Sequence, residues 1–186
     1  TWRLLRWMSR GNESPPWLRD EVERLAAIMS LRPPWVVLSP RVATPVVWGL
    51  ARPTLIWPAQ LGQAPSSSIW EGIIIHELAH LKRRDHWVGV LEIIATAIWW
   101  WNPLLWLVRH HLRENAELAC DSWVIGTLPQ GRRAYAEAIL ELCQNVTKTV
   151  ASVPACGVGR GPRRSLERRL TMILRDRVHF RIPRTG

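Results

Sequence analysis

Two histidines and a glutamate in one short segment are the residues of this chain best suited to chemistry. His76 and His80 are four positions apart, with Glu77 between them, in the apolar stretch Ile-Ile-Ile-His-Glu-Leu-Ala-His-Leu. If the stretch is helical, both imidazoles lie on one face, with about 5–6 Å between their Cβ atoms. Both rings then reach a single zinc ion, and Glu77 lies beside the metal as the base that activates water. The alternative is a buried helix whose histidines form local hydrogen bonds.

A catalytic zinc site needs a third protein ligand, and the chain offers two candidates. His86 lies six residues after His80, but Arg83 stands where a related zinc motif has the glycine that turns the chain back to the metal. Glu117 is the better candidate, because a carboxylate in apolar surroundings needs a cation. Asp121, on the same helical face, is predicted to accept the ring N–H of a ligating histidine. The alternative places Glu117 on the solvated face of its helix.

The elements around these residues predict a single α+β domain, mainly helical and gluzincin-like, with a small edge sheet and an apolar helical hairpin. Prolines between the β-branched runs confine the short strands to edges or strand ends, where an extended peptide can add. The arginines of the last helix are expected to face solvent or phosphate. Over residues 1–186 we expect a juxtamembrane lead-in at 1–16, a helix at 17–31, the sheet at 32–58, the zinc helix at 69–84, the hairpin carrying the third ligand at 86–125, and C-terminal helices at 131–176.

Residues 87–108 form the most apolar part of the chain, with Glu92 as the single charged residue. The segment is long enough to span a bilayer, but the helix that carries Glu117 has to return to the histidines. Asn102 and Pro103 mark the expected reversal, because proline disfavours helix in the residue before it. We therefore predict an apolar hairpin that dips into a membrane without crossing it. A buried hydrophobic core is the alternative.

The composition also favours a lipid partner. The chain has 25 Lys and Arg against 15 Asp and Glu, a formal net charge of +10, and 13 Trp. A basic protein suits an anionic membrane, and indole rings favour the membrane interface, so nucleic acid is not the expected partner. Three cysteines cannot all pair within one chain, which is typical of a reducing compartment. The start at Thr1 suggests a cut from a longer polypeptide, and the oligomeric state is not indicated.

Several short motifs follow one another along the chain. They are Gly49-x-x-x-Pro53, a strand ending at Pro58, His76-Glu-Leu-Ala-His80 followed by Arg83, Arg84 and Asp85, Asn102-Pro103-Leu-Leu-Trp106, and Glu117-Leu-Ala-Cys-Asp121. In this order they resemble the BlaR/MecR-type membrane metallopeptidases, the zinc protease domains of bacterial β-lactam sensor-transducers and their relatives. The likeness covers roughly residues 17–176.

The resemblance implies a gluzincin domain in the cell membrane that faces the cytoplasm, with transmembrane helices beside it. It implies His76, His80 and Glu117 as zinc ligands, Glu77 as the catalytic base and Asp121 as the partner of a ligating histidine. It also implies that the substrate is a protein, such as a transcriptional repressor or the receptor itself.

The expected function is that of a zinc-dependent endopeptidase acting on a protein or peptide, in which Glu77 activates water and then protonates the leaving amine. Candidates for stabilising the oxyanion are His110, Arg113, Tyr135 and His179. The alternative is a signalling module that does not cleave and in which a closed zinc site is structural.

Overall fold

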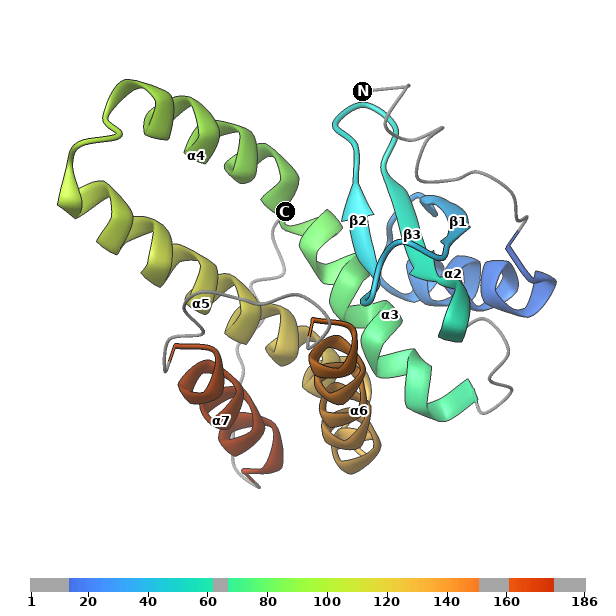
Figure 1. Cartoon of the computed structure of the whole chain (residues 1–186). Coiled ribbons are helices and arrows are strands. Elements are labelled where there is room, and N and C mark those ends of the chain that lie inside the picture. Colours follow the sequence, from blue (N-terminus) through green and yellow to red (C-terminus); the bar gives the residue numbers. More distant parts are fainter. Residues whose placement is uncertain (1–13, 62–66, 151–160, 176–186) are drawn as a thin grey trace.

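The computed structural model describes residues 14–61, 67–150 and 161–175. They form helices around a small sheet, which confirms the predicted α+β class (Figure 1). The elements are α2 (Pro16–Ile28), β1 (Trp35–Ser39), β2 (Val46–Trp48), β3 (Thr54–Pro58), the 3-10 turn η1 (Ala59–Leu61), α3 (Ser67–Lys82), α4 (Asp85–Ile98), α5 (Pro103–Thr127), α6 (Arg132–Val150) and α7 (Gly161–Leu174). Residues 1–13 of the predicted lead-in lie outside the described residues.

The sheet contains three short strands within the predicted range 32–58, in the order β1-β3-β2. β3 is the central strand, parallel to β1 and antiparallel to β2, and all of its residues are buried. Pro53 precedes β3 and Pro58 is its last residue, so neither ring interrupts the middle of the ladder. β2 forms an edge of the sheet and contacts α3.

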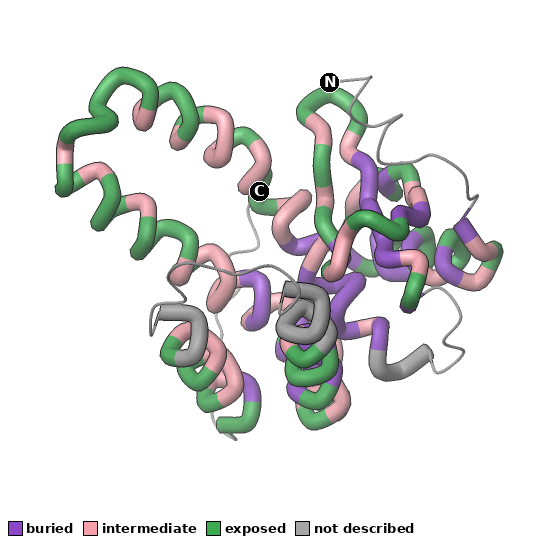
Figure 2. The backbone as a smooth tube through the Cα atoms, viewed as in Figure 1, coloured by how far each residue is buried: buried purple, intermediate pink, exposed green. Residues whose placement is uncertain are grey.

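α3 is the central helix of the molecule. In Figure 1 it runs between the sheet and α2 on one side and α5 and α6 on the other. A helix covered on several sides is apolar around most of its circumference, and Ile73, Ile74 and Ile75 are accordingly all buried. Each such side chain contributes about 1.5–3 kcal/mol through burial. Residues from the other elements complete this core, which Figure 2 shows as the buried part of the tube. They include Leu18, Leu25, Leu55, Trp57, Ile125, Ile139 and Ile173.

A residue in the left-handed region separates the central helix from the hairpin. Arg84 has a φ of 60°, and α4 begins at the next residue, Asp85. α3 spans Ser67–Lys82, so it begins and ends slightly earlier than the predicted range 69–84. Lys82 Nζ donates a hydrogen bond to the Met29 carbonyl oxygen at 2.8 Å, which fixes this end of α3 to the end of α2.

α4 and α5 form the predicted apolar hairpin, which projects away from the other elements (Figure 1). The chain reverses at Asn102, whose side-chain oxygen accepts the N–H of Leu104 at 2.9 Å, and α5 begins at Pro103. The two helices are joined by Glu92 of α4, whose carboxylate accepts hydrogen bonds from two arginines of α5. The one acidic residue of the apolar segment is thereby neutralised within the hairpin.

Most of the hairpin is exposed. No residue of α4 is buried, and Figure 2 shows both helices near the reversal as exposed or intermediate, so this segment does not form the alternative buried core. Within the described ranges, none of the helices combines the length and apolar character needed to cross a membrane. The second half of α5 returns to the core, where Cys120, Asp121, Val124 and Ile125 are buried.

Candidate metal centre

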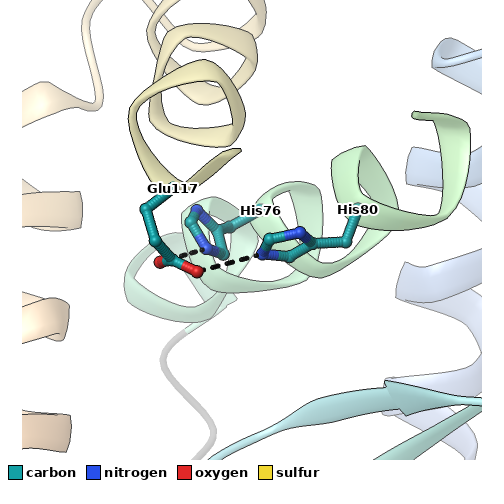
Figure 3. Close-up of side chains that lie close together, drawn as sticks. All are labelled: His76, His80 and Glu117. Carbon is teal, nitrogen blue, oxygen red and sulfur yellow. Dashed lines mark ion pairs between the residues drawn. The ribbon is translucent and has the colours of Figure 1, made fainter. Parts of the chain in front are cut away.

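His76, His80 and Glu117 lie close together at the contact between α3 and α5 (Figure 3). Both histidines come from consecutive turns of α3, and Glu117 comes from the returning half of α5. Glu117 Oε2 lies 3.4 Å from His76 Nε2, and Glu117 Oε1 lies 3.6 Å from His80 Nε2. The two imidazole rings are edge to face, with their centroids 4.9 Å apart. The three predicted ligands are therefore brought together from two separate segments.

The spacing of these atoms fits a zinc ion. Catalytic zinc binds imidazole nitrogens and carboxylate oxygens at about 2.0–2.2 Å, and the four positions around it are tetrahedral. Two bonds of this length at a tetrahedral angle separate their donor atoms by about 3.4 Å. The observed separations of 3.4 and 3.6 Å are close to this value, although they run from the two different oxygens of Glu117. One donor atom from each of the three residues lies within 4.8 Å of the others, so the three side chains are near enough to bind one ion together.

The charges of His76 and Glu117 depend on each other. Burial opposes protonation of His76, but its hydrogen bonds to Asp121 and Glu117 outweigh this effect and raise the pKa of His76 to about 9. Desolvation likewise opposes ionisation of Glu117, yet the contact with His76 and the other nearby cations lower its pKa. Without a metal the two residues form an ion pair, and the proton on His76 takes the place of a cation.

Glu77 lies between the two histidines in sequence and is half-buried. Desolvation raises the pKa of its carboxyl group, whereas the two histidines and a hydrogen bond from the backbone of Val47 oppose this rise. Val47 is the middle residue of β2, so Glu77 lies at the edge of the sheet. A carboxyl group with a raised pKa beside a metal position is suited to accepting and returning a proton.

The Nδ1 side of His76 contacts two groups. Asp121 Oδ1 lies 3.1 Å from His76 Nδ1, and the Tyr135 hydroxyl oxygen lies 2.8 Å from the same nitrogen. The Tyr135 hydroxyl donates a hydrogen bond to Asp121 Oδ1 at 2.6 Å. Because Asp121 and Tyr135 occupy the Nδ1 side, Nε2 is the nitrogen of His76 that faces Glu117.

Asp85, which sequence reasoning did not identify as a site residue, holds the second histidine. Its Oδ2 lies 2.8 Å from His80 Nδ1, and Cys120 Sγ lies 3.4 Å from the same nitrogen. Desolvation opposes ionisation of Asp85, but its hydrogen bonds to His80 and Arg83 lower its pKa. The sequence feature that could have identified Asp85 is its position directly after the two arginines that follow the histidine motif.

Arg169 of α7 is the second residue that the sequence did not reveal. The prediction that the arginines of the last helix face solvent or phosphate is wrong for Arg169, whose side chain is 18% exposed and contacts two carboxylates. It is correct for the neighbouring Arg168, which is 60% exposed. The Arg169 guanidinium contacts both Asp121 and Glu117. Carboxylates in apolar surroundings require a cation, so the predicted placement of Glu117 and Asp121 could have suggested that a basic residue such as Arg169 contacts them.

The predicted oxyanion stabilisers lie elsewhere or outside the described chain. His110 and Arg113 are exposed on the hairpin part of α5, and each pairs with a glutamate outside the metal centre. Tyr135 is buried on the Nδ1 side of His76, where its hydroxyl donates a hydrogen bond to Asp121. His179 lies outside the described residues. The contacts of the three described candidates therefore lead away from the space between the ligands.

A helical His-Glu-x-x-His segment with a further carboxylate beside it is a pattern that metallopeptidases use. The chain belongs to the BlaR1 peptidase M56 family, whose sequence model matches residues 6–173. This match confirms the resemblance to the BlaR/MecR-type proteins.

Individual relatives cover different shares of the chain. Regulatory protein BlaR1 from Bacillus licheniformis is 25% identical over 137 residues, which are 73% of this chain and 22% of that protein. The methicillin resistance mecR1 protein of Staphylococcus aureus is 29% identical over 104 residues, 55% of this chain and 18% of that protein. Regulatory protein BlaR1 of Staphylococcus aureus is 24% identical over 106 residues, which are 56% of this chain and 18% of that protein. The chain spans about a fifth of the length of these relatives.

Proposed function

We propose that this domain is a zinc-dependent endopeptidase, associated with a membrane, that cleaves a regulatory protein or itself during signal transduction. The observation that carries the proposal is the convergence of His76, His80 and Glu117, with one donor atom of each within 4.8 Å of the others and Glu77 beside them in sequence. Membership of the BlaR1 peptidase family supports the peptidase activity. The relatives named as regulatory and resistance proteins support the signalling role.

The chemistry divides between the metal and the chain. When bound, zinc supplies Lewis acidity toward a peptide carbonyl and lowers the pKa of water to about 7. The carboxylate of Glu77 accepts a proton from the attacking water and donates it to the nitrogen of the leaving amine. Asp121 and Asp85 accept the Nδ1 protons of the two histidines, so Nε2 of each ring faces Glu117 and would be the atom that holds the metal.

β2 supports a protein or peptide as the substrate. The backbone of its middle residue, Val47, contacts Glu77, so the edge of the sheet adjoins the catalytic carboxyl group. The flanking residues Val46 and Trp48 are exposed. An extended peptide that pairs with this edge through backbone hydrogen bonds would lie along the metal centre. We therefore expect cleavage within an unfolded segment or a flexible loop.

The hairpin supports attachment to a membrane. Its apolar side chains are exposed on both helices and at the reversal, and arginines lie at both of its feet. Indole rings and basic residues together favour the interface of an anionic leaflet, which is typical of the cytoplasmic side. We propose that the hairpin dips into that leaflet while the metal centre faces the cytoplasm. The exposed residues are Trp87, Leu91, Ile93, Ile94, Ile98, Trp99, Trp100, Trp101, Leu104, Trp106, Leu107 and Val108.

The second candidate, a signalling module with a structural zinc, has less support. Structural zinc sites are closed by four protein ligands. The group of His76, His80 and Glu117 offers three ligands, and the side chains of Glu117 and His80 are 35% and 23% exposed. Cys120 does not supply the fourth ligand, because it contacts the Nδ1 side of His80 rather than Nε2. An open position for water and substrate is what a hydrolase requires.

The test compares Glu77→Gln with the unsubstituted chain. We expect both to bind one zinc per chain, and we expect the variant to lose peptide cleavage by about 10²–10⁴-fold, because the glutamine amide cannot accept the proton. Glu71→Gln is the matched control, because Glu71 is on the same helix but pairs with Arg24. Mass spectrometry of products from a mixture of unstructured peptides measures cleavage. Equal cleavage by Glu77→Gln would rule out the mechanism, and zinc binding without any cleavage by the unsubstituted chain would favour the signalling module.

A further inference from the structure

Arg169 connects two acidic residues that lie one turn apart on α5. Its Nε and Nη2 donate to Oδ2 and Oδ1 of Asp121, each at 2.8 Å, and its Nη1 lies 2.9 Å from Glu117 Oε2. A planar guanidinium with five donors is suited to holding two carboxylates in this way, and a lysine ammonium is not. Arg169 belongs to α7, so a helix late in the chain completes the surroundings of the carboxylate ligand.

Asp121 gives this contact its electrostatic importance. Its side chain is fully buried, and a buried carboxylate without a cation is strongly unfavourable. The same carboxylate lies 3.1 Å from His76 Nδ1. Among the residues that the structure describes, Arg169 therefore contacts one metal ligand, Glu117, directly and a second, His76, through Asp121.

We propose that Arg169 is a positioning residue for the metal centre, which orients Glu117 directly and His76 through Asp121. The inference rests on the proposed role of His76 and Glu117 as zinc ligands. Two effects of Arg169 oppose each other, because its positive charge repels a cation whereas its hydrogen bonds keep the ligands in the binding orientation. Residues that orient metal ligands typically change metal affinity by about 10–100-fold when mutated, so the orientation outweighs the repulsion.

A purely structural role would give a different set of results. If Arg169 only anchors α7 to α5, its substitution lowers the stability of the metal-free protein and leaves the metal centre unchanged. If Arg169 positions the ligands, the metal affinity and the ligand geometry change as well. Arg169→Lys separates these roles, because lysine keeps the positive charge but cannot bind Asp121 and Glu117 in a planar, paired arrangement.

The experiment uses the full chain and three measurements. They are the zinc dissociation constant by competition with a chromophoric chelator, the visible absorption spectrum of the Co²⁺-loaded protein, and thermal unfolding of the metal-free protein. We expect Arg169→Lys to weaken zinc binding about tenfold or more and to alter the Co²⁺ spectrum. Arg168→Lys is the matched control, because Arg168 is adjacent but exposed, and it should change neither. Arg169→Gln provides the same test if the lysine variant does not fold.

The outcomes separate this inference from the proposed function. Zinc affinity within about twofold of the unsubstituted chain, with an unchanged Co²⁺ spectrum in a folded Arg169 variant, would overturn the positioning role and leave the metal site standing. A lower unfolding temperature without any change at the metal would assign Arg169 to the anchoring of α7 and overturn it equally. Failure of the unsubstituted chain to bind zinc would instead overturn the proposed function.

Discussion

At the scale of single residues, the proposed metal centre would place a proton and a metal ion in competition for His76. The ring is buried, and its contacts with Asp121 and Glu117 raise its pKa from 6.5 to about 9. The protonated ring therefore stabilises the metal-free fold below about pH 6.5, and this contribution is lost as the pH rises through about 9. Zinc requires the neutral ring, so its binding changes in the opposite direction.

The first prediction follows from this competition. Zinc affinity should rise by up to about tenfold per pH unit between about pH 6.5 and 9 and level off above that range, because one proton leaves His76 when the metal binds. Isothermal titration at a series of pH values, corrected for buffer ionisation, measures this slope. His111→Asn should keep the slope, because His111 is exposed and lies outside the metal centre. An affinity that stays flat across this range would contradict the raised pKa.

At the scale of elements, the close approach of α3 and α6 positions the hydroxyl that contacts His76. Gly72 of α3 faces Tyr135 of α6, and a Cβ atom added at Gly72 would lie 2.5 Å from Tyr135 Cδ2. No real Cβ atom tolerates such a distance, so a larger residue would force the tyrosine ring or the helix to move. The glycine therefore allows Tyr135 to reach both His76 and Asp121.

We predict that Gly72→Ala lowers the free energy of unfolding by about 1–3 kcal/mol, because it overpacks this contact. Gly89→Ala is the control, because nothing lies within 4 Å of the corresponding Cβ on α4. The control should leave stability unchanged or raise it by up to about 1 kcal/mol, through the higher helix propensity of alanine. Denaturant unfolding of both variants measures the difference. If Gly72→Ala had the same free energy of unfolding as the unsubstituted chain, α3 and α6 would accommodate the added methyl group without loss of stability.

At the scale of the whole molecule, the chain combines a well-packed part with an exposed apolar projection. Buried residues gather around α3, whereas the hairpin of α4 and α5 presents apolar side chains outward (Figure 2). An exposed apolar surface of this kind marks a site of association. The tryptophans at its reversal and the basic residues at its feet favour a lipid surface over a protein groove.

We predict that the chain binds vesicles that contain anionic phospholipid, and that it does so through the hairpin. Replacing Trp99, Trp100 and Trp101 together with glutamate should abolish binding in a vesicle flotation assay, because charged side chains oppose insertion into lipid. Trp35→Glu is the control, because Trp35 is 71% exposed but lies on β1. It should bind as the unsubstituted chain does. Full binding by the triple variant would exclude the hairpin as the membrane contact.

Local patterns in the sequence predicted much of this arrangement. Pairs of residues four apart, such as His76 with His80 and Glu117 with Asp121, share a helical face whatever the rest of the chain does. The hairpin followed from one apolar run and a proline, because Pro103 disfavours a continuous helix. Prolines also marked the ends of the strands, since they cannot donate to the ladder. Each of these rules acts over only a few residues.

The amino-acid sequence by itself determined the family, the helical positions of the predicted ligands and the apolar hairpin between them, because short-range spacing and composition encode these features. The sequence also indicated Asp121 as a partner of a histidine, but only the tertiary structure decided that Asp85 and Arg169 contact the predicted ligands. Asp85 reaches His80 because the chain turns sharply at Arg84, and Arg169 reaches Glu117 because α7 packs against α5. Such contacts depend on the relative placement of whole elements. No local periodicity specifies that placement, since it results from the packing of the entire core.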